Sequence, residues 1–103
     1  MKKVINGKIY DTKTADVIDE WSSHHNCGDF GHSAETLYRT KRGAFFVYGE
    51  GGPLTKWSIP VGSNGRGGSA DIEALTRDEA LRWCEERNTD SDRITELFGL
   101  EDA

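Results

Sequence analysis

Residues able to bind a metal or attack a substrate gather in one short segment. Three histidines and one of the two cysteines lie within nine positions, as His24, His25, Cys27 and His32. Imidazole and thiolate are donors that zinc prefers, usually four in a tetrahedral array. The segment contains neither a C-x-x-C pair nor an H-x3–5-H pair, so we expect a polar, glycine-punctuated loop without metal. A zinc-binding module built on residues 24–32 is the alternative interpretation.

No catalytic or nucleotide-binding motif in the chain is complete. Cys27 and a neighbouring histidine offer a nucleophile and a base, but no third group or oxyanion motif accompanies them. The segment 49–56 resembles a phosphate-binding loop in composition (GEGGPLTK), yet threonine precedes the lysine and a proline interrupts it. Acidic residues such as Glu35 suit acid–base catalysis only at distances that one sequence does not give. We therefore expect a protein that is not an enzyme and needs no cofactor.

The chain is small and acidic. Its 103 residues include 18 acidic and 13 basic side chains, which gives a net charge of −5. This length suits one domain over residues 1–103, and the charge opposes general affinity for DNA or anionic membranes. No N-terminal apolar run predicts a signal peptide, and no stretch approaches the length of a membrane span. We expect a cytoplasmic protein with free cysteines and no membrane contact.

Turn signals and β-branched residues predict strands in the first part of the chain. Asn6 and Gly7 form a two-residue turn signal between short strands. Residues 15–21 also fit one face of a short helix. A strand is favoured there, because Val17 and Ile18 are β-branched and the flanking residues are turn-like.

The clearest hairpin lies in the middle of the chain. Apolar and polar residues alternate over residues 36–48 on either side of a turn at 41–43, as a half-buried sheet requires. A further strand is expected at 70–75. Between them we expect a short edge segment at 56–61 and a glycine-rich loop at 62–69.

Two short helices complete the chain. Thr76 followed by Glu79 matches a capping box and predicts a helix to about residue 87. A second helix, capped by Asp90 or Ser91, ends at Gly99. Together these patterns predict an α+β fold. It consists of an antiparallel meander of about four to five strands, with the two C-terminal helices packed on one face.

Several blocks resemble small proteins carried by bacterial phages and mobile elements. They are residues 6–15 (NGKIYDTKTA), 35–41 (ETLYRTK), 46–56 (FVYGEGGPLTK) and the start of the acidic helix at 75–83 (LTRDEALRW). Proteins of this size and origin include anti-CRISPR proteins, which usually bind an effector complex rather than catalyse a reaction. The resemblance implies an inhibitor that binds a defence protein or a ribonucleoprotein complex in the bacterial host cell.

This interpretation makes seven residues candidates for partner binding. They are three aromatic residues and four carboxylates: Tyr38, Tyr48, Trp57, Asp71, Glu73, Asp78 and Glu79. Exposed aromatics are typical binding hot spots, and carboxylates take the place of phosphates in a basic channel. The alternative is a small nucleic-acid-binding protein whose sheet presents aromatic and basic side chains. The acidic balance argues against direct nucleic-acid binding.

Overall fold

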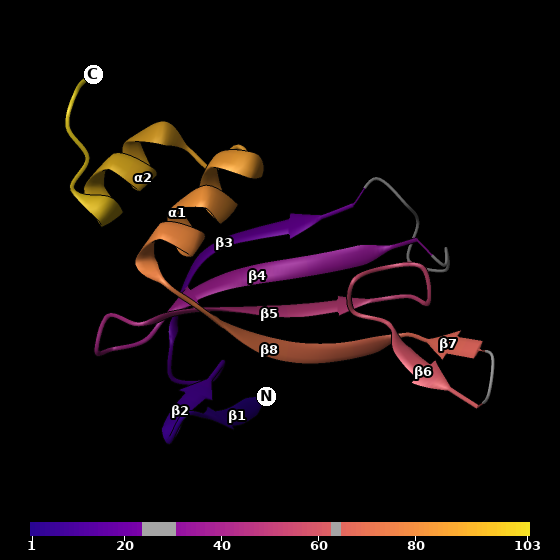
Figure 1. The fold of residues 1–103 in the computed structure, drawn as a ribbon. Coiled ribbons are helices and arrows are strands. Elements are labelled where there is room, and N and C mark those ends of the chain that lie inside the picture. Colours follow the sequence, from indigo (N-terminus) through magenta and orange to yellow (C-terminus); the bar gives the residue numbers. More distant parts are fainter. Residues whose placement is uncertain (24–30, 63–64) are drawn as a thin grey trace.

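The chain forms an antiparallel sheet with two helices on one face (Figure 1). The computed structural model describes residues 1–23, 31–62 and 65–103. The elements are β1 (Lys2–Ile5), β2 (Lys8–Asp11), β3 (Asp16–Ser22), β4 (Ser33–Arg39), β5 (Phe45–Gly51), β6 (Ile59–Val61), β7 (Gly65–Gly67), β8 (Ser69–Leu75), α1 (Arg77–Glu86) and α2 (Ser91–Phe98). The predicted α+β fold, a meander followed by two C-terminal helices, is confirmed.

The main sheet has four strands in the order β3-β4-β5-β8, and all neighbours are antiparallel. The predicted central hairpin forms the two middle strands of this sheet, β4 and β5. Leu37 pairs there with Val47, and both side chains are fully buried. Gly43 has a φ of 90° in the connecting turn, a conformation that favours glycine. The strand predicted at 15–21 is also confirmed, with a bulge beside Ile18.

One face of the sheet packs against α1 and α2. The buried side chains between them form the main core: Ile18, Leu37, Phe45, Val47, Trp57, Ala80, Trp83, Cys84, Ile94 and Phe98. The capping box at the start of α1 is present, with Thr76 and Glu79 exchanging hydrogen bonds of 2.9 and 3.1 Å. Asp90 caps α2, which ends at Gly99 with a φ of 61°. Both predicted helix starts are confirmed, because each needs only residues that are neighbours in sequence.

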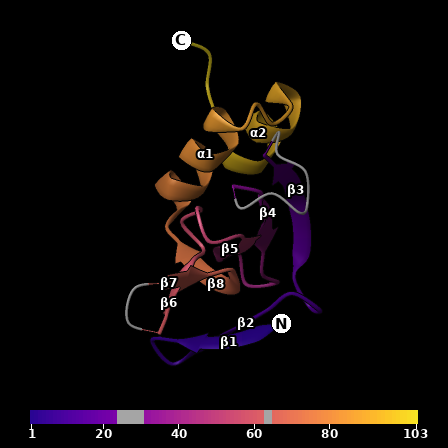
Figure 2. The ribbon, with the colours of Figure 1, turned by 90° about the vertical axis from the view of Figure 1, so that its right-hand side faces the viewer.

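The opposite face is covered at one end by the β1–β2 hairpin (Figure 2). Asn6 and Gly7 have φ angles of 51° and 77°, as a tight two-residue hairpin turn requires. Tyr10 meets Phe46 edge-on, with ring centroids 5.5 Å apart, and Tyr38 stacks on the same ring at 5.0 Å. These aromatic rings and their apolar neighbours form a second, smaller core.

The segment between β5 and β8 differs from the sequence-based expectation. The edge segment predicted at 56–61 does not join the main sheet, because β6 pairs with β7 in a separate hairpin. The loop predicted at 62–69 therefore contains a strand, Gly65–Gly67. The alternation of apolar and polar residues gave no signal there, because this strand, Gly-Arg-Gly, has no apolar side chain.

Cationic side chains reach carbonyl groups at both edges of the main sheet. Lys3 Nζ donates to Ile72 O of β8 at 3.4 Å, and Arg93 Nη2 donates to Val17 O of β3 at 3.1 Å. Charged groups at these positions discourage pairing with the edge of another sheet. Neither α1 nor α2, the helices of the described chain, has the length and apolar character needed to cross a membrane.

We predict that Gly49→Ala destabilises the fold. A Cβ at position 49 would overlap the ring of Trp57, which lies over β5 and is only 7% exposed. Overpacking of a buried site costs about 1–3 kcal/mol, and we expect the upper part of that range in urea-induced unfolding. Glu50→Ala, at the next and exposed position, is the control and should change stability by less than about 0.5 kcal/mol. Equal stability of Gly49→Ala and the wild type would contradict this packing.

Candidate functional site

The seven predicted partner-binding residues do not meet on one surface. They separate into a tyrosine pair on the main sheet (Tyr38, Tyr48), four carboxylates on β8 and the first turn of α1 (Asp71, Glu73, Asp78, Glu79) and one tryptophan in the main core (Trp57). The tyrosines and the tryptophan belong to different hydrophobic clusters. A partner that contacts all seven would have to reach both faces of the sheet.

The expectation that Trp57 is an exposed hot spot is wrong. Its ring packs over Gly49 of β5, where the missing side chain leaves room for the indole. The indole N–H donates a 3.1 Å hydrogen bond to the buried carboxylate of Glu35. Trp57 therefore stabilises the core and offers no surface to a partner.

Tyr38 and Tyr48 form a tyrosine face on the side of the sheet opposite the helices. Thr36 pairs with Tyr48 and lies two residues from Tyr38 on the same strand, so the three side chains share one face. Both tyrosines are half-buried. Burial raises the pKa of both phenols, and the charges of Glu20 near Tyr38 and Glu50 near Tyr48 raise them further. At neutral pH both hydroxyls are therefore protonated and able to donate hydrogen bonds.

Three of the four predicted carboxylates are already engaged within the chain. Lys3 Nζ donates to both oxygens of Asp71 at 2.9 Å, and this bond holds the pKa of Asp71 below its ordinary value of 3.8. Glu73 lies 3.6 Å from Lys56. Glu79 accepts the N-cap backbone N–H of α1, which lowers its pKa in turn. The fourth, Asp78, is exposed and forms no hydrogen bond or ion pair with any described residue.

The densest concentration of negative charge in the chain extends beyond the four predicted carboxylates. We define the helical layer as residues 77–103, which contain α1, α2 and the C-terminal tail. Its nine carboxylates are all exposed: Asp78, Glu79, Glu85, Glu86, Asp90, Asp92, Glu96, Glu101 and Asp102. The layer has only four arginines, so it carries the whole net charge of −5. The preceding 76 residues contain nine acidic and nine basic side chains and are neutral.

The arginines of the helical layer are mostly turned toward the protein. Arg77 donates to the carbonyl at the end of α2, Arg93 to a β3 carbonyl, and Arg87 to Glu35. Among the described residues, the contact between Arg87 and Glu86, at 3.4 Å, is the one ion pair that involves any of the nine carboxylates. The outer surface of the helices is therefore weakly compensated and attractive to cations.

A buried ionic cluster, which the sequence analysis did not find, joins the helical layer to the sheet. Glu35 on β4 is 4% exposed and accepts bonds from Trp57 Nε1 at 3.1 Å, Trp83 Nε1 at 2.8 Å and Arg87 Nη2 at 2.8 Å. The Arg87 guanidinium lies over the rings of Trp21 and Trp83, at 5.1 and 4.9 Å. All three tryptophans of the chain thus contact one ion pair.

One sequence feature could have predicted this buried cluster. Glu35 precedes Leu37 by two residues in an alternating strand, and such residues point to the same face. A carboxylate on the apolar face of a strand requires buried donors. Because both oxygens of Glu35 accept hydrogen bonds, its geometry serves to position α1 and the Trp57 loop on β4.

The predicted histidine and cysteine loop is only partly described. His24, His25 and Cys27 lie outside the described residues, whereas His32 lies just before β4 and accepts the N–H of Gly52 through its carbonyl. Within the described part of the chain, no three His, Cys, Asp or Glu side chains converge on a possible metal position. Cys84 is fully buried in the main core, and burial raises the pKa of its thiol.

No family model, curated protein or solved structure matches the chain. Its function must therefore be inferred from its own surfaces. Two surfaces stand out among the described residues: the helical layer is strongly charged, and the tyrosine face presents aromatic hydrogen-bond donors.

We predict that Glu35→Ala lowers the free energy of unfolding by about 3–5 kcal/mol, because Arg87 and two indole N–H groups lose their buried acceptor. Glu86→Ala is the matched control. It removes the other carboxylate that contacts Arg87, but Glu86 is 61% exposed, so a loss below about 1 kcal/mol is expected. Chemical denaturation measures both variants. Similar small losses for the two would contradict a structural role for Glu35.

Proposed function

We propose that this chain is a non-enzymatic binding protein, an anti-CRISPR-like inhibitor that a phage or mobile element carries. It binds a host defence protein or a ribonucleoprotein complex in the bacterial cytoplasm. The helical layer makes the contact. The observation that carries this proposal is the concentration of the whole net charge in nine exposed carboxylates on one layer of the molecule.

The physical basis of the proposal is charge complementarity. Complexes that handle nucleic acid line their channels with lysine and arginine, which attract phosphates. Exposed carboxylates on a protein surface bind such a channel where the phosphates would bind. Their long-range attraction raises the rate at which the two proteins associate. The buried Glu35 cluster holds α1 on the sheet, so little conformational freedom is lost on binding. Asp78, which has no described partner of its own, is available to a basic surface.

The tyrosine face is a second candidate for the contact. Tyr38 and Tyr48 are half-buried and protonated, and tyrosine is enriched among residues that dominate binding energy. The face is bordered by the carboxylates of Glu20 and Glu50, so it also favours a partner with basic groups.

We predict that the chain restores phage plaque formation on bacteria protected by CRISPR immunity, tested across several effector types. The triple variant Asp78→Asn, Glu85→Gln and Glu96→Gln should lose this activity, because it removes exposed charge from the helical layer. The matched control Asp78→Glu, Glu85→Asp and Glu96→Asp keeps the charge at the same exposed positions and should retain it. Failure of the wild-type chain to restore plaques, or equal loss of this activity in the neutralised variant and the control, would contradict the proposal.

Binding to the purified effector should also depend on salt. We predict that the dissociation constant rises at least about tenfold between about 50 and 200 mM salt, since several charge pairs form at the interface. The neutralised variant should show a shallower salt dependence than the control that keeps the charge. An affinity that does not change with salt would remove the helical layer from the contact.

Tyr48→Ala separates the two candidate surfaces. If the tyrosine face contributes, the variant weakens effector binding by about tenfold or more while the protein stays folded. Tyr48→Phe is the control, because it keeps the ring that packs in the second core and removes only the hydroxyl. Unchanged affinity of a folded Tyr48→Ala variant would confine the contact to the helical layer.

A further inference from the structure

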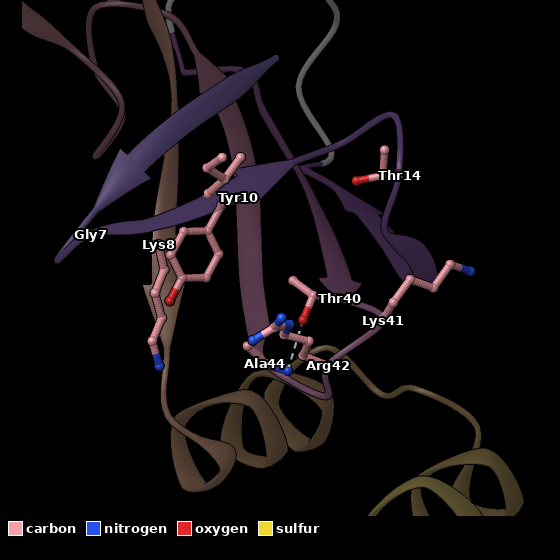
Figure 3. A pocket seen from close by; sticks show the side chains of 9 residues that line it. Gly7, Lys8, Tyr10, Thr14, Thr40, Lys41, Arg42 and Ala44 are labelled. Carbon is pink, nitrogen blue, oxygen red and sulfur yellow. Dashed lines mark hydrogen bonds between the residues drawn. The ribbon is translucent and has the colours of Figure 1, made fainter.

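A groove of about 490 Å³ lies between the β1–β2 hairpin and the turn that joins β4 to β5 (Figure 3). Its lining residues come from these two hairpins and the loop before β3: Gly7, Lys8, Ile9, Tyr10, Thr14, Thr40, Lys41, Arg42 and Ala44. The volume lies within the range typical of small-molecule sites. None of the seven predicted partner-binding residues contributes to it.

Both walls of the groove are held in place by hydrogen bonds or packing. On the first, Tyr10 is buried against Phe46 of the sheet. On the second, Thr40 Oγ1 accepts the N–H of Ala44 at 3.0 Å, and the two residues also share a backbone hydrogen bond of 2.8 Å. Lys41 pairs with Asp16 at 2.8 Å and thereby ties this turn to β3. The groove is thus formed before any ligand arrives, which lowers the entropic cost of binding.

The groove is basic although the chain as a whole is acidic. Three of its nine lining residues are cationic, namely Lys8, Lys41 and Arg42, and none is acidic. Asp16 compensates Lys41, whereas Lys8 and Arg42 take part in none of the ion pairs among the described residues. In Figure 3 the amine of Lys8 and the hydroxyl of Tyr10 point to the same side of the groove, and Arg42 extends from the facing wall. An anion placed there would meet two uncompensated cations and a hydroxyl donor.

We infer that this groove binds a small phosphate monoester with an attached ring system, of the size of a mononucleotide. Lys8 and Arg42 bind the phosphate, and the arginine fork suits two of its oxygens. Ala44 and the edge of Tyr10 give the groove an apolar wall, against which the sugar and base pack. This site is independent of the proposed inhibitory contact, because it lies on the β1–β2 side of the molecule and not in the helical layer.

Titration of the ¹⁵N-labelled full chain with adenosine 5′-monophosphate tests the inference. We expect saturable shift changes at Lys8, Tyr10 and Arg42, with a dissociation constant on the order of 1 mM or lower. Adenosine and inorganic phosphate, each carrying half of the recognised chemistry, should bind at least about tenfold more weakly. Lys8→Gln and Arg42→Gln should each weaken the nucleotide by about tenfold, and Lys13→Gln, an exposed lysine outside the groove, should not.

A 5′-phosphorylated dinucleotide distinguishes the source of the phosphate. Tighter binding than the mononucleotide assigns the groove to the end of a nucleic acid, and equal or weaker binding assigns it to a free nucleotide. The ¹⁵N spectra of the variants confirm that they remain folded, as expected for exposed side chains. Absence of saturable shifts with either phosphate ligand, or equal weakening by Lys13→Gln, overturns the inference. Neither result bears on the effector contact, which is measured separately.

Discussion

The architecture depends on one buried carboxylate. An ionised side chain inside a protein costs several kcal/mol unless its oxygens are bonded. Glu35 meets this requirement with the indole of Trp57 from the loop after β5, the indole of Trp83 from α1 and the guanidinium of Arg87, the C-cap of α1. Two segments that are distant in sequence, the loop after β5 and the C-terminal end of α1, are therefore fixed relative to β4. The arrangement also draws the cation of Arg87 inward, where it offsets one of the nine carboxylates of the helical layer, Glu86.

The uneven charge of the molecule comes from its composition, and the inward position of Arg87 leaves most of the carboxylates on the helices without a paired cation. The sheet and its hairpins are neutral overall, the helical layer carries the full excess of negative charge, and the groove beside β1 and β2 is locally positive. A surface of this kind attracts basic partners over a distance without any rearrangement of the fold. The helical layer and the groove thus present surfaces of opposite charge.

Local signals accounted for most of the fold but little of the site. The Asn6–Gly7 turn, the capping box at Thr76 and the alternation around Leu37 each involve neighbouring residues, so the sequence alone predicts them. Trp57 could not be placed in this way, because its burial depends on Gly49, and a glycine in the sequence does not show which ring fills the space beside it. The role of Glu35 likewise depends on donors 22 to 52 residues away. The composition of residues 77–103 shows the negative charge of the helical layer. It does not show that the arginines point inward and leave most of this charge unpaired.

Hydrogen exchange at the three indole N–H groups tests the central role of Glu35 most directly. In a ¹H–¹⁵N spectrum recorded after transfer to D₂O, the signals of Trp57 and Trp83 should persist far longer than that of Trp21, whose N–H donates to no described residue. Such protection reports a buried bond that opens only with the surrounding structure. Exchange of all three signals at the same fast rate would show that the carboxylate does not hold the loop and the helix, and would contradict this account of the fold.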